Sequence, residues 1–365
     1  MYGEHLTAFE IKDLLEYVFE VNLKREIDAG ERPVPICIWG KHGLGKTASV
    51  YSFAKSKGWQ IEYCAPAQFE EMGDFHGLPV KSEKSNETRY LPPTWVPKNN
   101  GPGILLLDDI NRADDRILRG LMQLLQNFEM FSWKVPPKWQ IVCTANPEGG
   151  DYSVTSMDDA MLNRMLHLTM IFDVKAWASW AIENHVDSRG INFVLSYPEA
   201  ITGKKTTPRS LVQVFSQLKE IPDLKKELRK VSIIAKSGLD ETTVSSLLSF
   251  ITTDLEFLVG AEEILEANSF EEIKNRIKQA ARGQGGEIRI DRLHVICTRL
   301  FMALSSENLK NLSAKNRNNL INFLKLPELP ADLRFSLHRD IATLSEEKSS
   351  ILNDEEISSL VLKAL

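Results

Sequence analysis

Short, almost continuously apolar runs recur through the first half of the chain and alternate with longer segments of mixed polarity. The runs lie at residues 36–39, 61–65, 104–109, 140–146 and 167–172. Short runs without polar alternation are typical of strands that are covered on both faces, and the segments between them have helical patterns. The alternation therefore predicts an α/β domain in which helices flank a parallel sheet.

Helical patterns surround these runs. In residues 8–20 the apolar side chains recur three and four positions apart, which predicts an amphipathic helix before the first strand. The polar stretch 79–103, rich in proline, lysine and asparagine, predicts a long exposed excursion. Beyond about residue 174 the strand pattern stops, and amphipathic segments follow one another with breaks that include 206–208 and 282–286.

These breaks predict three parts. We expect an α/β domain with its N-terminal helix at 1–173, a helical domain at 174–281 and a helical C-terminal extension at 287–365. The chain has 365 residues, of which 43% are hydrophobic, so each part can bury a core. Whether the last helices form a collar, dock a partner or only add structure is left open by the sequence.

Composition excludes several classes of protein. The net charge is -6, so no global field attracts nucleic acid or an anionic membrane. The first residues lack the pattern of a signal peptide, and no later run is long enough to span a membrane, so we expect a cytoplasmic protein. The widely spaced Cys37, Cys64, Cys143 and Cys297 suit reduced core thiols better than disulfides or a metal site.

A glycine-rich motif, GKHGLGKT, directly follows the first apolar run and opens a helical segment. A strand, a glycine-rich loop and a helix in this order form a phosphate-binding loop, in which backbone N–H groups surround a polyphosphate. Lys46 supplies a positive charge to the outer phosphates, and the Thr47 hydroxyl is a ligand for Mg²⁺. We expect His42 to be solvated. The candidate nucleotide-binding residues are Gly40, Lys41, His42, Gly43, Leu44, Gly45, Lys46, Thr47 and Ala48.

A second motif supports the first. The apolar run 104–109 ends in two carboxylates, Asp108 and Asp109. An ATPase with a phosphate-binding loop needs one such group for Mg²⁺ and one to polarise the attacking water. We assign Asp108, together with Thr47, to the metal and Asp109 to the water. ATP and Mg²⁺ are therefore the expected cofactors.

The sequence around both motifs resembles that of the AAA+ ATPases of the MoxR family, which carry an insert in the second helix. The segments LLLDDINRADDRILRGLMQLLQ, CTANPEGGDYS, MDDAMLNRM and TTPRSL occur in the family's order over roughly residues 33–215. The resemblance implies an AAA+ parallel sheet flanked by helices, an all-helical lid and here a helical C-terminal extension. It also implies that Asn146 is the sensor 1 residue, Arg164 the arginine finger and Arg209 the sensor 2 residue.

Each of these roles has a structural alternative. Asn146 could hydrogen-bond the turn before Pro147, and Arg164 could be an ordinary surface arginine. Arg209 follows Pro208, which suits the first turn of a helix. Arg112, within the family's INRA motif, could serve a subunit interface or a local salt bridge.

The chain departs from the family at Asp109, where most members have glutamate. Aspartate is one methylene shorter, so hydrolysis is either slow or adapted to the shorter reach. The family inserts a hairpin after this motif, and the aromatic residues of 127–134 could face a central pore or pack on the domain. Asp74 and His76 are expected to be structural, and Trp39, with residues 32–35, lies where adenine often docks in such folds.

The resemblance implies a Mg²⁺-dependent ATPase that assembles as a ring, with a hexamer as the expected size. Members of the family act as chaperone-like activators, often beside a partner with a von Willebrand factor A domain. The alternatives are a nucleic-acid motor or restriction-type NTPase, which the net charge of -6 disfavours, and a nucleotide-gated binding switch with weak hydrolysis. No membrane partner is expected.

Overall fold

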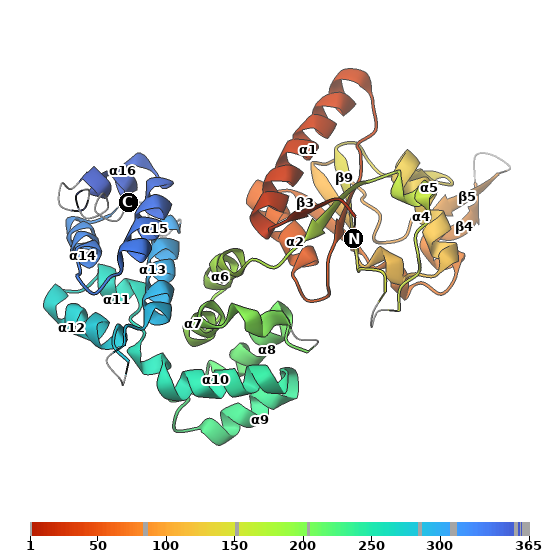
Figure 1. Ribbon diagram of the computed structural model, residues 1–365. Coiled ribbons are helices and arrows are strands. Elements are labelled where there is room, and N and C mark those ends of the chain that lie inside the picture. The colour runs from red at the N-terminus through yellow and green to blue at the C-terminus, as the bar shows by residue number, and fades with distance from the viewer. Residues whose placement is uncertain are drawn as a thin grey trace. The chain divides into compact units, whose positions relative to one another are not determined.

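The computed structural model divides the chain into two compact units (Figure 1). Unit 1 comprises Met1–Ala176 and Thr207–Arg209, and unit 2 comprises Trp177–Thr206 and Ser210–Leu365. The structure describes residues 2–82, 87–149, 153–202, 205–283, 287–306 and 312–353, together with Ile357 and Ser359.

Unit 1 is built on a six-stranded sheet in which all neighbouring strands are parallel. The strands are, in spatial order, β1 (Glu4–Leu6), β10 (Leu166–Met170), β2 (Ile36–Trp39), β9 (Trp139–Ala145), β6 (Gly103–Leu107) and β3 (Gln60–Cys64). The five apolar runs of the sequence all form strands here, so the parallel sheet is confirmed. The edge strand β1 was not predicted, because it has only three residues and two of them are polar and exposed.

Helices cover both faces of this sheet. The helices of unit 1 are α1 (Ala8–Ala29), α2 (Lys46–Lys57), α3 (Met72–His76), α4 (Asp115–Asn127) and α5 (Asp159–Leu162), with short 3₁₀ turns η1 (Pro66–Gln68) and η2 (Ile110–Arg112). The alternation of side chains along β2 assigns the faces, because successive residues of a strand point to opposite sides. Ile36 and Ile38 pack with α1 and α2, whereas Cys37 and Trp39 belong to the core beneath α4.

Two small hairpins lie beside the sheet. One joins β4 (Leu78–Lys81) to β5 (Thr88–Leu91), and the other joins β7 (Glu129–Met130) to β8 (Trp133–Lys134). The long exposed excursion expected at 79–103 contains most of the first hairpin, whose strands the sequence did not predict. Leu78 and Leu91 form an exposed cross-strand pair, so the hairpin has no buried face that would give it a clear sequence pattern.

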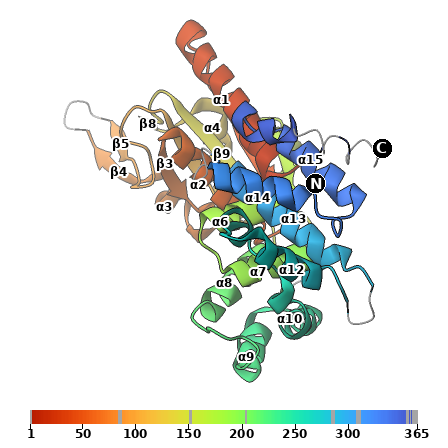
Figure 2. The same ribbon diagram turned by 90° about the vertical axis from the view of Figure 1, so that its left-hand side faces the viewer.

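The elements of unit 2 in its described part are helices and 3₁₀ turns, as expected; outside them Arg282 and Ile288 form an isolated antiparallel bridge. After α6 (Val174–Glu183), which spans the boundary, its elements are α7 (Ser188–Ser196), η3 (Pro198–Thr202), α8 (Pro208–Leu218), α9 (Leu228–Gly238), α10 (Glu241–Thr253), η4 (Leu255–Phe257), α11 (Ala261–Leu265), α12 (Phe270–Ala280), α13 (Ile290–Ser305), α14 (Ala314–Leu324), α15 (Ala331–Ala342), α16 (Glu346–Ser349) and η5 (Ser350–Asn353). Helix α12 packs against both α13 and α14 (Figure 2).

One hydrophobic core joins the helices before and after residues 282–286. Ile264 and Ile277 on one side share it with Leu293 and Leu320 on the other. The division into a lid at 174–281 and an extension at 287–365 stays a prediction. In the described residues no single helix has the length and apolar character to cross a membrane. Helix α10 and the segment Leu255–Leu265 meet these two criteria only when they are taken together, and they are bent by 47° relative to each other.

All four cysteines are free and buried, which confirms the expectation of core thiols. Cys37 and Cys143 are register partners on neighbouring strands, and Cys297 lies in the core of unit 2. Burial disfavours the thiolate, so it raises the pKa of all four thiols, to about 12 for Cys64 and Cys297. These side chains are structural in the free protein.

Candidate nucleotide-binding site

The glycine-rich loop connects the end of β2 to the start of α2. Gly45 precedes the helix with φ 99° and Gly43 has φ 72°, a left-handed region that side chains rarely adopt. A Cβ atom at Gly43 would lie 2.7 Å from Thr207 Oγ1, so glycine is also required sterically. The free N–H groups at the start of α2 face the loop, which makes this an anion-binding position.

Lys46 is the charged group of the loop and is buried. Its Nζ donates to Gly40 O at 2.8 Å, Lys41 O at 3.3 Å and Asn146 Oδ1 at 3.1 Å. Burial lowers the pKa of Lys46, while the nearby Asp109 and Asp108 oppose this effect. Among the described residues no carboxylate forms an ion pair with Lys46, so its positive charge is available for an anion.

Asp108 lies directly after β6 and accepts three hydrogen bonds. Oδ1 accepts from Thr47 Oγ1 at 2.6 Å and Thr144 Oγ1 at 2.7 Å, and Oδ2 accepts from the Tyr63 hydroxyl at 3.2 Å. Burial and the charge of Asp108 raise the pKa of Tyr63 to about 12, so this hydroxyl stays a donor. The two predicted metal ligands, Thr47 and Asp108, are thus in contact.

The contact fits a magnesium site. A hydroxyl and a carboxylate oxygen are hard ligands, and Mg²⁺ is bound in proteins through one or two carboxylates together with substrate phosphates. No group of three or more His, Cys, Asp or Glu side chains within the described ranges is arranged to hold a metal alone. This donor set suits Mg²⁺ that arrives with a nucleotide.

Asp109 begins the turn after Asp108 and has a left-handed backbone, with φ 50° and ψ 46°. Its N–H donates to Thr144 Oγ1 at 2.8 Å, and its Oδ2 lies 3.4 Å from Arg112 Nε. Arg112 therefore makes a local ion pair. The carboxylate of Asp109 is about one-third exposed and can reach solvent beside the loop.

Asn146 follows β9 and is completely buried. Its Oδ1 accepts from Lys46, whereas its Nδ2 has no partner among the described residues. The side chain of Asn111 holds its backbone, because Asn111 Nδ2 donates to Asn146 O at 2.7 Å and Asn146 N donates to Asn111 Oδ1 at 3.0 Å. The amide is therefore fixed next to Lys46 with one donor group unused.

The other two predicted arginines lie in different surroundings. Arg209 is exposed in the first turn of α8, within unit 1, and its charge contributes to the lowered pKa of Lys46. Arg164 follows α5; its Nε and Nη2 donate to Gln126 Oε1 at 3.2 and 3.0 Å, and its Nη1 donates to Ala160 O. Arg164 thus contacts α4 and α5 and not the phosphate loop of its own chain.

Three residues of the site escaped the sequence analysis as functional candidates. Thr144 and Tyr63 contact Asp108, and Asn111 holds Asn146. The parallel order of β3, β6 and β9 brings their carboxyl ends together, and this order is not visible in the sequence. The one signal for Thr144 in the sequence was its position in the apolar run 140–146, two residues before Asn146.

The adenine expectation for Trp39 finds no support. Trp39 is fully buried, packs against Tyr2 with ring centroids 4.6 Å apart, and donates from Nε1 to His167 Nδ1 at 2.9 Å. Its ring has no exposed surface for a base.

The hairpin at 127–134 divides its aromatic residues between two roles. Phe128 and Trp133 are buried in the core, whereas Phe131 at the tip is 54% exposed and stacks on Tyr90 at 4.6 Å. The backbone carbonyl oxygen of His76 accepts from Trp133 Nε1 at 2.9 Å, and the ring of His76 packs on Phe131 at 4.3 Å. The structural role expected for His76 stays a prediction. Asp74, which accepts from the N–H of Glu71, stabilises the start of α3.

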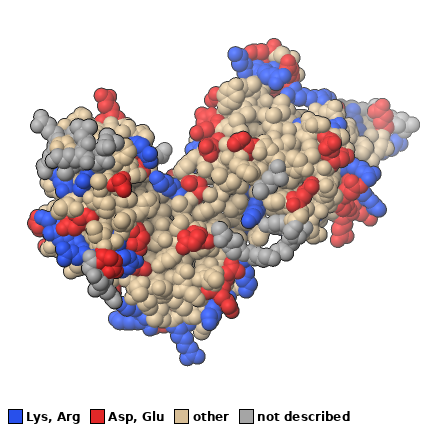
Figure 3. All heavy atoms as spheres, in the orientation of Figure 1, with Lys and Arg blue, Asp and Glu red and all other residues tan. Residues whose placement is uncertain are grey.

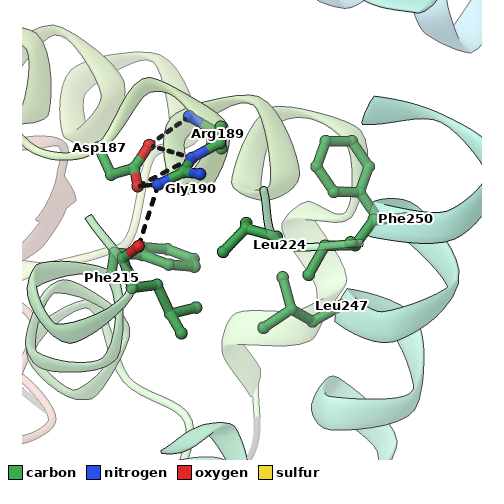
Figure 4. Close-up of a pocket in the computed structure, with 9 residues that line it drawn as sticks. Asp187, Arg189, Gly190, Phe215, Leu224, Leu247 and Phe250 are labelled. Carbon is green, nitrogen blue, oxygen red and sulfur yellow. Dashed lines mark hydrogen bonds and ion pairs between the residues drawn. The ribbon is translucent and has the colours of Figure 1, made fainter. Parts of the chain in front are cut away.

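A small pocket in unit 2 is lined by Arg189 and apolar side chains (Figure 4). Arg189 fills one side; it pairs with Asp187 and donates to the carbonyl oxygens of Leu218 and Ile221. The free volume is about 10 Å³, which is the space of about one water molecule. Arg189 therefore holds the helices of unit 2 together.

Known proteins match this chain in two comparisons. Residues 35–165 match the model of the AAA domain of the dynein-related subfamily. Among solved structures, the chain resembles the RuvB Holliday junction branch migration motor of Thermotoga maritima, with 14% identity over 77% of this chain and 86% of that chain and a TM-score of 0.36. A mutant of the same protein gives 14% identity, coverage of 87% and 91%, and a TM-score of 0.38.

At this identity and TM-score the likeness to RuvB does not extend to function. The matched range 35–165 includes the phosphate loop, Asp108, Asp109, Asn146 and Arg164. Unit 1 of this chain therefore contains an AAA domain of the dynein-related subfamily.

Proposed function

We propose that the chain is a Mg²⁺-dependent ATPase that remodels or activates a partner protein. The observation that carries the proposal is the convergence of two sequence motifs and a third strand end. Lys46 contacts Asn146, and Thr47 contacts Asp108, although these residues lie about 60 to 100 positions apart. An AAA domain supplies the fold in which such residues bind ATP.

Each residue has a role in the attack of water on the γ-phosphate. Lys46 and the loop N–H groups bind the phosphates. Mg²⁺, held by Thr47 and Asp108, would neutralise charge on the phosphate oxygens. Asp109 orients and polarises the water, and the unused Nδ2 of Asn146 helps to position the water or the phosphate. Arg209 is the candidate contact from the start of α8.

Arg164 is proposed to act on the nucleotide of a neighbouring copy. Its described partners are an amide oxygen and a backbone carbonyl oxygen, which leave its charge uncompensated. A guanidinium supplied by a second chain can stabilise charge in the transition state. We therefore propose a ring, with six subunits as the expected size. By resemblance to the MoxR family, the client would be a protein with a von Willebrand factor A domain.

A nucleotide-gated switch with weak hydrolysis is the second candidate. It is favoured by Asp109, whose short carboxylate is also occupied by Arg112. A nucleic-acid motor has less support, because the net charge is -6 and basic and acidic side chains are interspersed on the face shown in Figure 3.

Steady-state phosphate release tests the proposal. We compare the wild-type chain with Lys46→Ala, which removes the phosphate contact, and with Asp109→Glu, which lengthens the carboxylate. Wild-type turnover should exceed that of Lys46→Ala by at least about 100-fold, since a charged contact in the site is lost. Equal rates of phosphate release in the wild type and Lys46→Ala, with ATP still bound by the wild type, would contradict the proposed ATPase activity and favour the switch. In that case a gain of turnover in Asp109→Glu would assign the deficit to the short side chain.

A further inference from the structure

The hydroxyl of Thr144 lies between the two acidic residues of the site. Thr144 is the penultimate residue of β9, and its side chain is completely buried. Its Oγ1 is 2.7 Å from Asp108 Oδ1 and 2.8 Å from Asp109 N. A backbone N–H only donates and a carboxylate only accepts, so Oγ1 accepts from Asp109 and gives its single proton to Asp108.

We propose that Thr144 is a positioning residue that orients Asp108 and Asp109 together through one hydroxyl group. The roles of the two aspartates, one toward Mg²⁺ and one toward water, rest on the function proposed above. Thr144 itself contacts neither Mg²⁺ nor water in that scheme and acts through the carboxylate of Asp108 and the backbone of Asp109.

The contact with Asp109 fixes an uncommon backbone. A left-handed conformation is rare for residues other than glycine and persists when the surrounding structure holds it. The N–H of Asp109 is held by Thr144 Oγ1. Because aspartate has only one methylene, the direction of its backbone decides where the carboxylate points. Thr144 therefore determines the reach of the shortened acidic residue more than it would for glutamate.

The contact with Asp108 limits rotation of the proposed metal ligand. Leu107 and Cys143 are the last register partners of β6 and β9, so Asp108 and Thr144 follow them side by side. Oδ1 is held by Thr144 from a buried strand, and Oδ2 is held by the longer bond of 3.2 Å from the exposed Tyr63. Residues that hydrogen-bond to a metal ligand in this way orient it and strengthen metal binding.

Two substitutions of Thr144 separate the effect of its hydroxyl group from the effect of its side-chain shape. Thr144→Val keeps the branched shape without the hydroxyl, and Thr144→Ser keeps the hydroxyl. We measure binding of a fluorescent ATP analogue as Mg²⁺ is titrated, and also kcat and KM for ATP. Thr144→Val should raise the Mg²⁺ concentration at half-saturation and lower kcat, each by about 10- to 100-fold. Binding of the analogue without Mg²⁺ should change little, and Thr144→Ser should restore most of both losses.

Thr169→Val is the matched control. Thr169 is also buried in a strand of the same sheet, but its Oγ1 donates to the carbonyl oxygen of Tyr2 at 2.8 Å. Thr169→Val should lose about as much thermal stability as Thr144→Val and keep the Mg²⁺ dependence of the wild type. Tyr63→Phe, which removes the longer bond to Asp108, should shift the Mg²⁺ titration in the same direction by about tenfold or less.

Either of two outcomes overturns the proposal. One is a Thr144→Val chain with the Mg²⁺ dependence and kcat of the wild type. The other is a Thr144→Ser chain as impaired as Thr144→Val, since the hydroxyl would then not be the active group. If the wild type binds the analogue with Mg²⁺ but releases no phosphate, the ATPase fails, and the Mg²⁺ titration still decides the role of Thr144.

Discussion

Asn146 is completely buried, yet its Nδ2 donates to none of the described residues. Buried polar groups almost always have a partner, so this one is expected to find its partner in a ligand. The backbone of Asn146 is held by both ends of the Asn111 amide. At the scale of single residues, Asn111 thus controls where the unused donor points.

Replacing Asn111 tests this arrangement. Asn111→Ala removes two buried hydrogen bonds and leaves the N–H and C=O of Asn146 unpaired, which should lower the free energy of unfolding by about 2 kcal/mol or more. Urea titration measures this loss. Asn100→Ala, at an exposed asparagine of the same unit, is the control. Identical unfolding of the two variants would mean that water replaces the lost bonds and that Asn111 does not fix Asn146.

The sequence was informative for residues that stand in contiguous motifs. Lys46, Thr47 and Asp108 were predicted to share a site; Thr47 contacts Asp108, and its neighbour Lys46 contacts Asn146. The contributions of Thr144 and Tyr63 depend on which strands are neighbours in the sheet, and a linear pattern does not contain that information. The catalytic roles of Asp109, Arg164 and Arg209 stay predictions.

At the scale of elements, burial decided what could be predicted. The strands β2, β6 and β9 are buried along their whole length, and each gave a clear apolar run. The edge strand β1 and the hairpin of β4 and β5 expose most of their side chains, so no periodic pattern marked them. Their positions follow from pairing with other strands and not from local composition.

Helices α10 and α13 of unit 2 are joined by a buried ion pair. Asp254, which follows α10, accepts from Arg292 Nε and Nη2 at 2.9 and 2.8 Å and from Arg289 at 2.8 Å. Arg292 also lies over the ring of Phe257 at 4.4 Å. Burial opposes ionisation of Asp254, but the hydrogen bonds from Arg292 and Arg289 outweigh it and lower its pKa.

This network predicts a loss of stability in acid. A carboxyl group whose pKa is lower in the folded chain stabilises the fold above its unfolded value of about 3.9, and this contribution is lost as the pH falls through the folded pKa. Asp254→Asn leaves Arg292 buried without its charge partner, which should cost about 3 to 5 kcal/mol at neutral pH.

Urea unfolding between neutral pH and strong acid measures the contribution of Asp254. The variant should lose less stability than the wild type as the pH falls, since it lacks the titrating group. Asp223→Asn is the control, because the pKa of Asp223 is also lowered but its carboxylate is held by backbone N–H groups and Lys226 at the surface. Parallel pH curves for wild type and Asp254→Asn would refute the assignment.

At the scale of the whole molecule, the proposed reaction needs two copies of the chain. The phosphate loop and Asp108 form one half of the site, and the guanidinium of Arg164 is held on α4 and α5 by Gln126 and Ala160. Arg164→Ala should therefore reduce turnover by about 10³-fold or more, as expected for an arginine supplied across an interface, while ATP binding is kept.

Mixing two inactive chains tests the interface directly. Lys46→Ala lacks the phosphate contact but keeps Arg164, and Arg164→Ala has the reverse defect. A mixed assembly pairs an intact loop with an intact arginine at some interfaces, so turnover should appear in the mixture. Arg276→Ala, at an arginine of α12 paired with Glu263, should behave as the wild type in the same assay. A mixture as inactive as its parents would place Arg164 in its own chain's site or outside the reaction.

The burial of all four cysteines has a practical consequence for following how the molecule opens. A thiol reagent reaches a core cysteine only when the surrounding structure unfolds locally or globally. Cys37, Cys64 and Cys143 lie in the core of unit 1, and Cys297 lies in that of unit 2. The natural sequence thus carries chemical reporters in both units, and labelling rates with and without nucleotide distinguish opening of unit 1 from opening of unit 2.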